Sequence, residues 1–175
     1  MPFLTAAIAL AAAAAALAPA AASAQSTNSV PTWDRHFLEE TAEGAHFEID
    51  MGEIAERHAH GEPARRVAHL MVVDHSGELH AVKALAARLH VHLPNHPSIM
   101  QRHVISDVAA HHGAAFDRAY ARTEVGDHIV DIQSADGETV EGGLADVKAF
   151  AQKYRMVYLR HLAAFRLLAD DIGAS

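Results

Sequence analysis

The chain of 175 residues has no cysteine, few aromatic residues and fewer basic than acidic side chains. Without cysteine, disulfides cannot hold the fold, and a metal site must be built from histidine, carboxylate and water. Aromatic residues make up only 6% of the sequence, which together with abundant alanine favours closely packed helices over a sheet. Lys and Arg number 14 against 22 Asp and Glu, which argues against nucleic acid and anionic membranes as partners.

Two common catalytic motifs are also absent. The sequence contains no Gly-x-Ser-x-Gly elbow and no glycine-rich phosphate loop, so it gives no support for a serine hydrolase or a nucleotide enzyme. Half of the residues are hydrophobic, and the length suits one globular domain. We therefore expect a single all-α domain and look for its chemistry among histidine and acidic side chains.

The N-terminal stretch has the pattern of an export signal. Residues 1–24 carry no charged side chain, run through an Ala/Leu-rich segment and end in Ala22-Ser23-Ala24, an A-x-A cleavage pattern. We expect a signal peptide at 1–24, a polar tether at 25–33 and a helical domain at 34–175. The mature chain would have no membrane span and would reside in the periplasm or cell envelope.

The first half of the domain reads as a helical hairpin. Apolar residues recur every three to four positions, and Asp34 is expected to cap the first helix. That helix should end near His58. The Gly61-Glu62-Pro63 break separates it from a second helix that ends near Leu89, because glycine ends helices and proline suits a first helical turn.

The second half should contain two further helical segments. Ser98 and Gln101 have the spacing of a capping box, so a helix is expected over 99–133, interrupted at Gly113. Residues 135–143 are rich in Gly and Asp and are expected to form a loop before the last helix. The sequence shows no internal repeat.

The apolar stripe of each predicted helix carries one side chain that can bind a metal or a proton. These four candidate ligands are Glu48, His75, His128 and His161. Glu78 and Glu124 lie on the same stripes and are further candidate ligands. The candidate outer partners of the ligands are Tyr120, Tyr154, Tyr158, Asp74 and Asp127. If the helices form one bundle, the candidate ligands converge inside it.

Three histidines and one carboxylate suit a single divalent ion, and Fe, Zn, Cu and Ni are all admissible because imidazole discriminates poorly among them. A metal-free network of buried polar groups is an alternative. In a third arrangement the helices are rotated so that the groups never meet.

Short motifs in the order of the chain resemble a bacterial ferritin-like domain-of-unknown-function family, type 4142, whose members are described as predicted outer membrane or membrane proteins. The motifs are Asp34-Arg35-His36-Phe37-Leu38, Glu48-Ile49, Val73-Asp74-His75, Phe116-Asp117-Arg118-Ala119-Tyr120, Asp127-His128 and His161-Leu162. The resemblance implies a ferritin-like antiparallel four-helix bundle, running up-down-down-up, with a long crossover between helices 2 and 3. It implies export to the envelope and no established activity.

The sequence departs from the di-iron pattern, in which two helices carry Glu-x-x-His. Here His75 precedes Glu78, and Tyr158 occupies the position three before His161. We therefore expect binding or buffering of one transition metal ion. The competing hypothesis is a non-enzymatic envelope or stress-associated interaction protein, with a protein partner or its own copies, whose buried histidines form a structural polar network. A metal-dependent oxidase or peroxide-handling enzyme is the third and weakest hypothesis.

Most of the 15 histidines lie outside the four stripes. They gather at predicted helix ends and in the crossing segment, where exposed imidazoles either take up metal weakly or only add solvated polar surface. Their protonation would reverse the sign of the formal charge of −8 in mildly acidic solution. A pH-dependent association of the protein is therefore expected.

Overall fold

The computed structural model describes residues 29–174, and the regular secondary structure within that range is all helical. The helices are α1 (Thr32–His58), α2 (Glu62–Leu89), α3 (Ile99–Ala109), α4 (Ala114–Glu141) and α5 (Ala145–Asp171). This confirms the all-α prediction and adds a short separate helix, α3. The predicted signal peptide and residues 25–28 of the predicted tether lie outside the described residues. None of the described helices is both long enough and apolar enough to cross a membrane.

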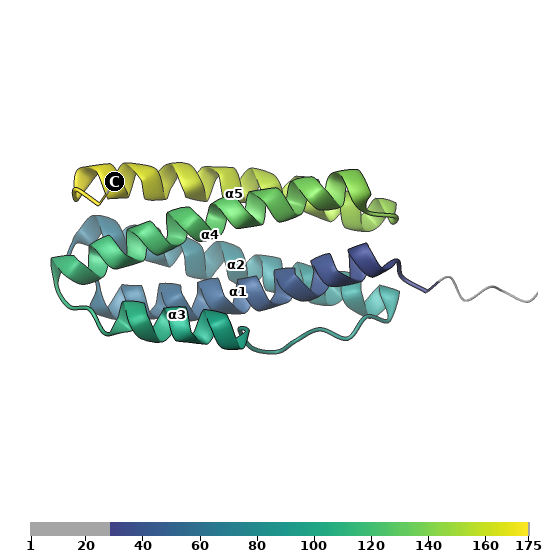
Figure 1. Ribbon diagram of the computed structural model, residues 1–175, viewed down its shortest axis with the longest axis horizontal. Coiled ribbons are helices and arrows are strands. Elements are labelled where there is room, and N and C mark those ends of the chain that lie inside the picture. The colour runs from purple at the N-terminus through teal and green to yellow at the C-terminus, as the bar shows by residue number, and fades with distance from the viewer. Residues whose placement is uncertain (1–28, 175) are drawn as a thin grey trace, which may run out of the picture.

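The four long helices form two antiparallel hairpins laid side by side (Figure 1). α1 packs mainly against α2, and α4 packs mainly against α5. Between the hairpins, α1 lies beside α4 and α2 beside α5. Each long helix therefore has antiparallel neighbours, and inward side chains of all four helices meet along one axis.

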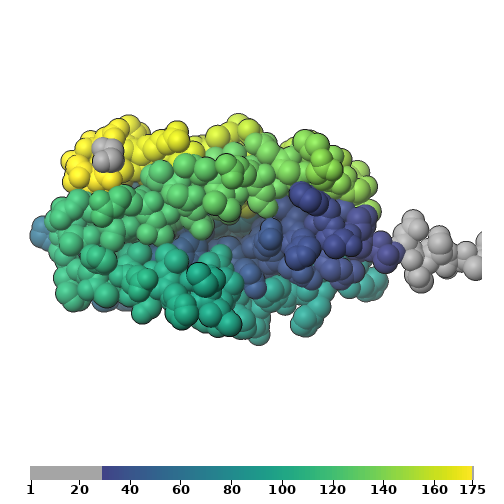
Figure 2. All heavy atoms as spheres, in the orientation of Figure 1, coloured from purple at the N-terminus to yellow at the C-terminus, as the bar shows by residue number. Residues whose placement is uncertain are grey.

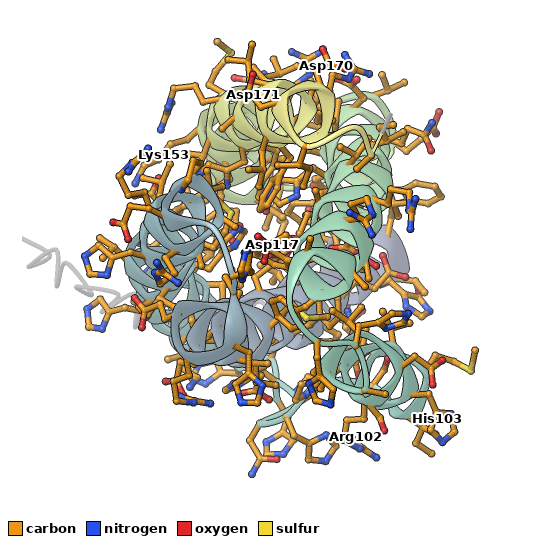
Figure 3. The ribbon with its side chains drawn as sticks, turned by 90° about the vertical axis from the view of Figure 1, so that its left-hand side faces the viewer. Arg102, His103, Asp117, Lys153, Asp170 and Asp171 are labelled. Atoms are coloured by element: carbon orange, nitrogen blue, oxygen red, sulfur yellow. The ribbon has the colours of Figure 1, made fainter. Side chains whose placement is uncertain are left out.

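The short helix α3 lies on the outside of this arrangement, against α1 and the start of α4. Its N-terminus has the predicted capping box, in which Ser98 Oγ accepts from the Gln101 backbone N–H and the Gln101 side chain accepts from the Ser98 N–H. Viewed along the helices, Arg102 and His103 of α3 point away from the molecule (Figure 3). The segment 90–113, with α3 in it, therefore carries the chain back along one side of the molecule.

Two local predictions were wrong. The N-cap position of α1 is Pro31, and Asp34 lies inside the first turn, where its carboxylate accepts from the backbone N–H groups of Gly143 and Leu144 at 2.8 and 2.7 Å. Residues 135–143 are not a loop, because α4 continues to Glu141. Gly137 within this stretch lies close to the Trp33 ring, where a Cβ would come to 3.3 Å. Tertiary packing therefore overrides the local turn signal.

The interior is divided along the bundle axis into two apolar clusters. The first contains Phe47, Met51, Phe116 and Phe165, and the second contains Phe37, Leu38, Val82, Leu85, Val147 and Phe150. Buried polar side chains, among them three histidines and three glutamates, lie on the stretches of helix between these clusters. Burying them requires partners, because an unpaired buried polar group costs about 1–3 kcal/mol.

Candidate metal centre

Three histidine rings from three helices meet in the polar layer. They are His75 of α2, His128 of α4 and His161 of α5, and all are at most 1% exposed. Their ring centroids lie 5.1 Å apart for His75 and His161, 5.2 Å for His128 and His161, and 5.8 Å for His75 and His128. One nitrogen from each ring lies within 4.8 Å of the other two. The hydrogen bonds around each ring decide which nitrogens carry a lone pair.

The His128 ring is fixed by its own helix. Its Nδ1 lies 2.9 Å from the backbone carbonyl oxygen of Glu124, one turn earlier in α4. A carbonyl oxygen only accepts, so Nδ1 carries the proton. In a neutral ring Nε2 then holds a lone pair, and this nitrogen points toward His161.

The His161 ring has the opposite tautomer. Its Nε2 lies 2.9 Å from Oδ2 of Asp74 in α2, which makes Nε2 the donor to a carboxylate. The free nitrogen is Nδ1, and it lies 3.2 Å from Nε2 of His128. With both rings neutral in these tautomers, two lone pairs face each other with no proton between them. A hydrogen bond between the rings would require one ring to give up its other partner or to become charged.

The third ring, His75, follows the same scheme. Its Nδ1 lies 2.7 Å from Glu78 Oε2, and the other Glu78 oxygen accepts from the Tyr158 hydroxyl. His75 Nε2 has no hydrogen-bond partner among residues 29–174 although it is buried. Glu78, predicted as a further ligand, therefore binds His75 on the side of the ring away from the free Nε2. Tyr158 in turn binds Glu78.

Burial keeps two of the rings neutral at pH 7. Desolvation, followed by the neighbouring His75 and His161, lowers the pKa of His128 to about 3. The pKa of His161 falls to about 4, again first through burial and then through His75, although Asp74 opposes the shift. Neutral imidazole is the form that binds a metal ion.

Glu48, predicted as a ligand beside the histidines, lies on the other side of the His128 ring. Its Oε1 is 3.8 Å from His128 Nδ1, the nitrogen already bonded to the Glu124 carbonyl. Glu124 Oε2 lies 3.7 Å from the same nitrogen. Asp127 and Asp131, one and two turns further along α4, complete an acidic group that the sequence identified only in part. Asp131 could have been found from its place on the same helical face as Glu124 and Asp127.

The acidic group resists ionisation. Burial raises the pKa of Glu48 well above its ordinary value, and Glu124 raises it further. Burial also raises the pKa of Glu124 to about 8, and the pKa of Asp131 is raised by burial and by Asp127. At pH 7 the Glu124 carboxyl group therefore holds a proton in the folded protein when no cation is nearby.

A cavity of about 220 Å³ connects this region with the surface. Its residues come from α1, α2, α3, α4 and α5, and Figure 2 shows a hollow where α1, α3 and α4 meet. The acidic residues along it are Glu40, Glu43, Glu78, Asp127 and Asp131. His75 and Tyr158 also contribute to its wall, so a small ion or molecule can approach the rings from this side.

The comparisons with known proteins give a family and no activity. The family model described as a domain of unknown function, DUF4142, matches residues 16–168. The chain belongs to this family. No curated protein and no solved structure shows a detectable match to it. The resemblance inferred from the short motifs is therefore confirmed, and the chemistry of this DUF4142 protein has to be inferred from its own residues.

The tyrosines of the DUF4142 domain that were predicted as outer partners lie in different places. Tyr158 bonds to Glu78. Tyr120 is fully buried against Phe165, and its hydroxyl has no hydrogen-bond partner within residues 29–174. Tyr154 lies in the other apolar cluster, beside Phe150. Its hydroxyl accepts from Lys153 Nζ.

The remaining histidines lie on the surface, apart from the half-buried His46. His69 pairs with Glu56 at 2.7 Å, and His96 and His111 bond to backbone carbonyl groups. His75, His128 and His161 are therefore more deeply buried than every other histidine of the described chain.

Proposed function

We propose that this DUF4142 protein binds a divalent transition metal ion through His75 Nε2, His128 Nε2 and His161 Nδ1, and stores or buffers it. The observation that carries the proposal is the 3.2 Å contact between two ring nitrogens whose protons are held elsewhere. A positive ion between them removes the repulsion of their lone pairs. Nitrogen ligands about 2.0–2.1 Å from a zinc ion at tetrahedral angles are about 3.3 Å from each other. The observed separation fits that spacing.

The groups behind the three rings support the same proposal. Asp74, Glu78 and the Glu124 carbonyl each accept a hydrogen bond from the ring N–H opposite the proposed ligand atom. Metal-binding histidines ordinarily donate in this way to a carboxylate or carbonyl, which fixes the ring and raises its basicity. Fe, Zn, Cu and Ni all accept imidazole ligands, so the donor set favours none of them strongly.

The wider proposal places the protein outside the cytoplasm. Residues 1–24 support it, because they have the composition and cleavage pattern of an export signal. The four long helices, with α3 inside the connection between hairpins, support a ferritin-like bundle with a long crossover. An envelope protein of this kind would sequester a metal ion that enters from outside the cell.

A structural role for the histidines is the competing proposal, and the hydrogen bonds of each ring to Asp74, Glu78 or Glu124 favour it. In that case the three rings form a metal-free polar network that specifies how the hairpins pack. The protein would then act through a partner in the envelope.

The metal content of the purified protein distinguishes the metal-binding proposal from the structural proposal. The untagged protein, purified from the cells that make it and dialysed against a mild chelator, is expected to retain about one equivalent of Fe, Zn, Cu or Ni. His128→Ala should lose this metal, whereas His103→Ala, which removes an exposed imidazole from α3, should keep it. Elemental mass spectrometry gives the stoichiometry. Absence of metal from the wild type, together with a loss of stability in His128→Ala, would support the structural network instead.

A further inference from the structure

Beside the His128 ring, four carboxyl groups gather without a lysine or arginine partner among the described residues. Glu48 comes from α1, and Glu124, Asp127 and Asp131 come from successive turns of α4. Glu48 and Glu124 are 1% and 0% exposed, and the two aspartates are half-buried. Oxygens of Glu48 and Asp131 and a nitrogen of His128 lie within 4.8 Å of one another.

Hydrogen bonding does not explain this gathering. All four side-chain oxygens of Glu48 and Glu124 are buried and find no N–H or O–H partner in the described part of the chain. Glu78 differs, because its two oxygens accept from His75 and Tyr158. A fold that buries two unpartnered glutamates carries a large cost, unless a ligand satisfies them.

The Tyr120 hydroxyl is a second unpartnered group beside the carboxylates. It is fully buried, lies one turn before Glu124 on the same face of α4, and has no partner within residues 29–174. Burial raises the pKa of the Tyr120 hydroxyl well above its ordinary value, and the nearby charges of Glu124 and Glu48 raise it further. The Tyr120 oxygen therefore adds to a group of possible metal ligands whose atoms are all oxygen.

The donor atoms decide which class of ion fits. His128 Nδ1 is not free to bind, because it donates to the Glu124 carbonyl. The available ligands are then carboxylate oxygens, which suit hard divalent cations such as Mn²⁺, Mg²⁺ and Ca²⁺. His128 Nε2 on the other edge of the ring, together with the His75 and His161 rings, suits softer transition metals. The two sides of one ring therefore present two different chemistries.

The cavity supplies access for such an ion. Asp127 and Asp131 lie in its wall, and Glu40 and Glu43 lie on the α1 side. No lysine or arginine is among the described residues that line it. A passage with charges of one sign attracts counter-ions and raises their local concentration.

We propose that Glu48, Glu124 and Asp131, with Asp127 at the approach, form a second cation site that takes a hard divalent ion through oxygen ligands. The site is separate from the imidazole centre and does not depend on it. The ion would neutralise the buried carboxylates and tie α1 to α4, which belong to different hairpins.

The test is a titration of the untagged, chelator-treated protein with Mn²⁺, followed by the loss of the free-ion signal in electron paramagnetic resonance. We expect about one saturable equivalent, and Glu48→Gln or Glu124→Gln should weaken it by about tenfold or more. These substitutions keep the side-chain shape. Glu138→Gln is the matched control, because Glu138 is another fully buried glutamate of α4 with two unpartnered oxygens in the described structure, and it lies near Asp34.

The same titration separates this proposal from the imidazole centre. His161→Ala should lose the Co²⁺ absorption spectrum and keep Mn²⁺, whereas Glu48→Gln should keep the Co²⁺ spectrum and lose Mn²⁺. Three results would overturn the second site: no saturable Mn²⁺ binding below about 1 mM, equal losses in Glu138→Gln and Glu124→Gln, or loss of Mn²⁺ in His161→Ala to the same extent as in Glu48→Gln.

Discussion

Asp34 and Asp117 make equivalent hydrogen bonds at opposite ends of the molecule. Asp34, in the first turn of α1, accepts from two consecutive N–H groups, Gly143 and Leu144, in the α4–α5 turn. Asp117, in the first turn of α4, accepts from His60 and Gly61 in the α1–α2 turn at 2.8 and 2.7 Å. In the end view of Figure 3, Asp117 points inward from α4.

The residues that make these bonds at the two ends are separated by the same number of positions along the chain. The spacing from Asp34 to Asp117 equals that from His60 to Gly143 and from Gly61 to Leu144. Each hairpin thus holds the turn of the other by equivalent bonds. The residues around the two aspartates are also similar, because Trp33-Asp34-Arg35-His36-Phe37 and Phe116-Asp117-Arg118-Ala119-Tyr120 both place Asp-Arg between two aromatic residues. This likeness is too short to predict an internal repeat, and the equivalence is evident from the bonds that the two aspartates make.

We expect Asp117→Ala to lower the free energy of unfolding by about 2–4 kcal/mol, because two hydrogen bonds to a charged group are lost and two N–H groups remain without an acceptor. Urea unfolding followed by circular dichroism measures the change. Asp170→Ala, which removes an exposed carboxylate from α5, should change stability by less than about 0.5 kcal/mol. Equal effects of the two substitutions would show that Asp117 does not hold the α1–α2 turn.

The close contact of α1 and α2 at Gly52 gives a second prediction. A Cβ at Gly52 would lie 2.8 Å from Val72 Cγ2 and 3.1 Å from the Ala68 carbonyl oxygen. Gly52→Ala should therefore destabilise the protein by about 1–3 kcal/mol through overpacking. Gly77→Ala in α2 meets no atom within 4 Å among the described residues and should stabilise by about 0.5–1 kcal/mol through helix propensity. Thermal unfolding of both variants tests the opposite signs.

Asp74→Asn should weaken binding of a transition metal without removing a ligand. Asp74 accepts from His161 Nε2 at 2.9 Å, and a neutral amide holds the ring tautomer less strongly than a carboxylate. We expect about a tenfold loss of Zn²⁺ affinity, measured by competition with a chelating dye. Asp136→Asn changes a surface carboxylate that pairs with Arg155 and should leave the affinity unchanged. Unaltered Zn²⁺ affinity in Asp74→Asn would contradict the role of Asp74 in orienting His161.

The buried acidic group predicts how stability depends on pH in metal-free protein. Glu124 has a pKa of about 8 in the fold against an ordinary value of 4.5, so unfolding releases its proton between these values. Its contribution therefore disfavours the folded state increasingly as pH rises through that window. The lowered pKa of His128 affects stability only below pH 6.5, outside the range from pH 7 to 8.

Glu124→Gln should accordingly flatten the decline of stability between pH 7 and pH 8, because glutamine does not titrate. Urea unfolding in the presence of chelator at several pH values measures the slope. Glu141→Gln, an exposed substitution on the same helix, should keep the wild-type slope. An unchanged slope in Glu124→Gln would mean that this carboxyl group is ionised in the folded protein.

Much of the helical architecture could be predicted because it depends on local signals. The Gly61-Glu62-Pro63 break ends one helix and starts the next, and Ser98 with Gln101 caps α3. The loop predicted over 135–143 was wrong, because its turn-forming residues are also compatible with a helix that packs against another hairpin. Such packing energy is absent from any local pattern.

The sequence by itself determined which residues share the inward face of each helix, because a period of 3.6 residues places His75, His128 and His161 on apolar stripes. Only the tertiary structure decided how these faces meet. Glu48 shares the inward face of α1, yet it lies with Glu124 on the far side of the His128 ring. The rotation of each helix about its axis and the pairing of the hairpins set that arrangement, and both arise from contacts between segments distant in the sequence.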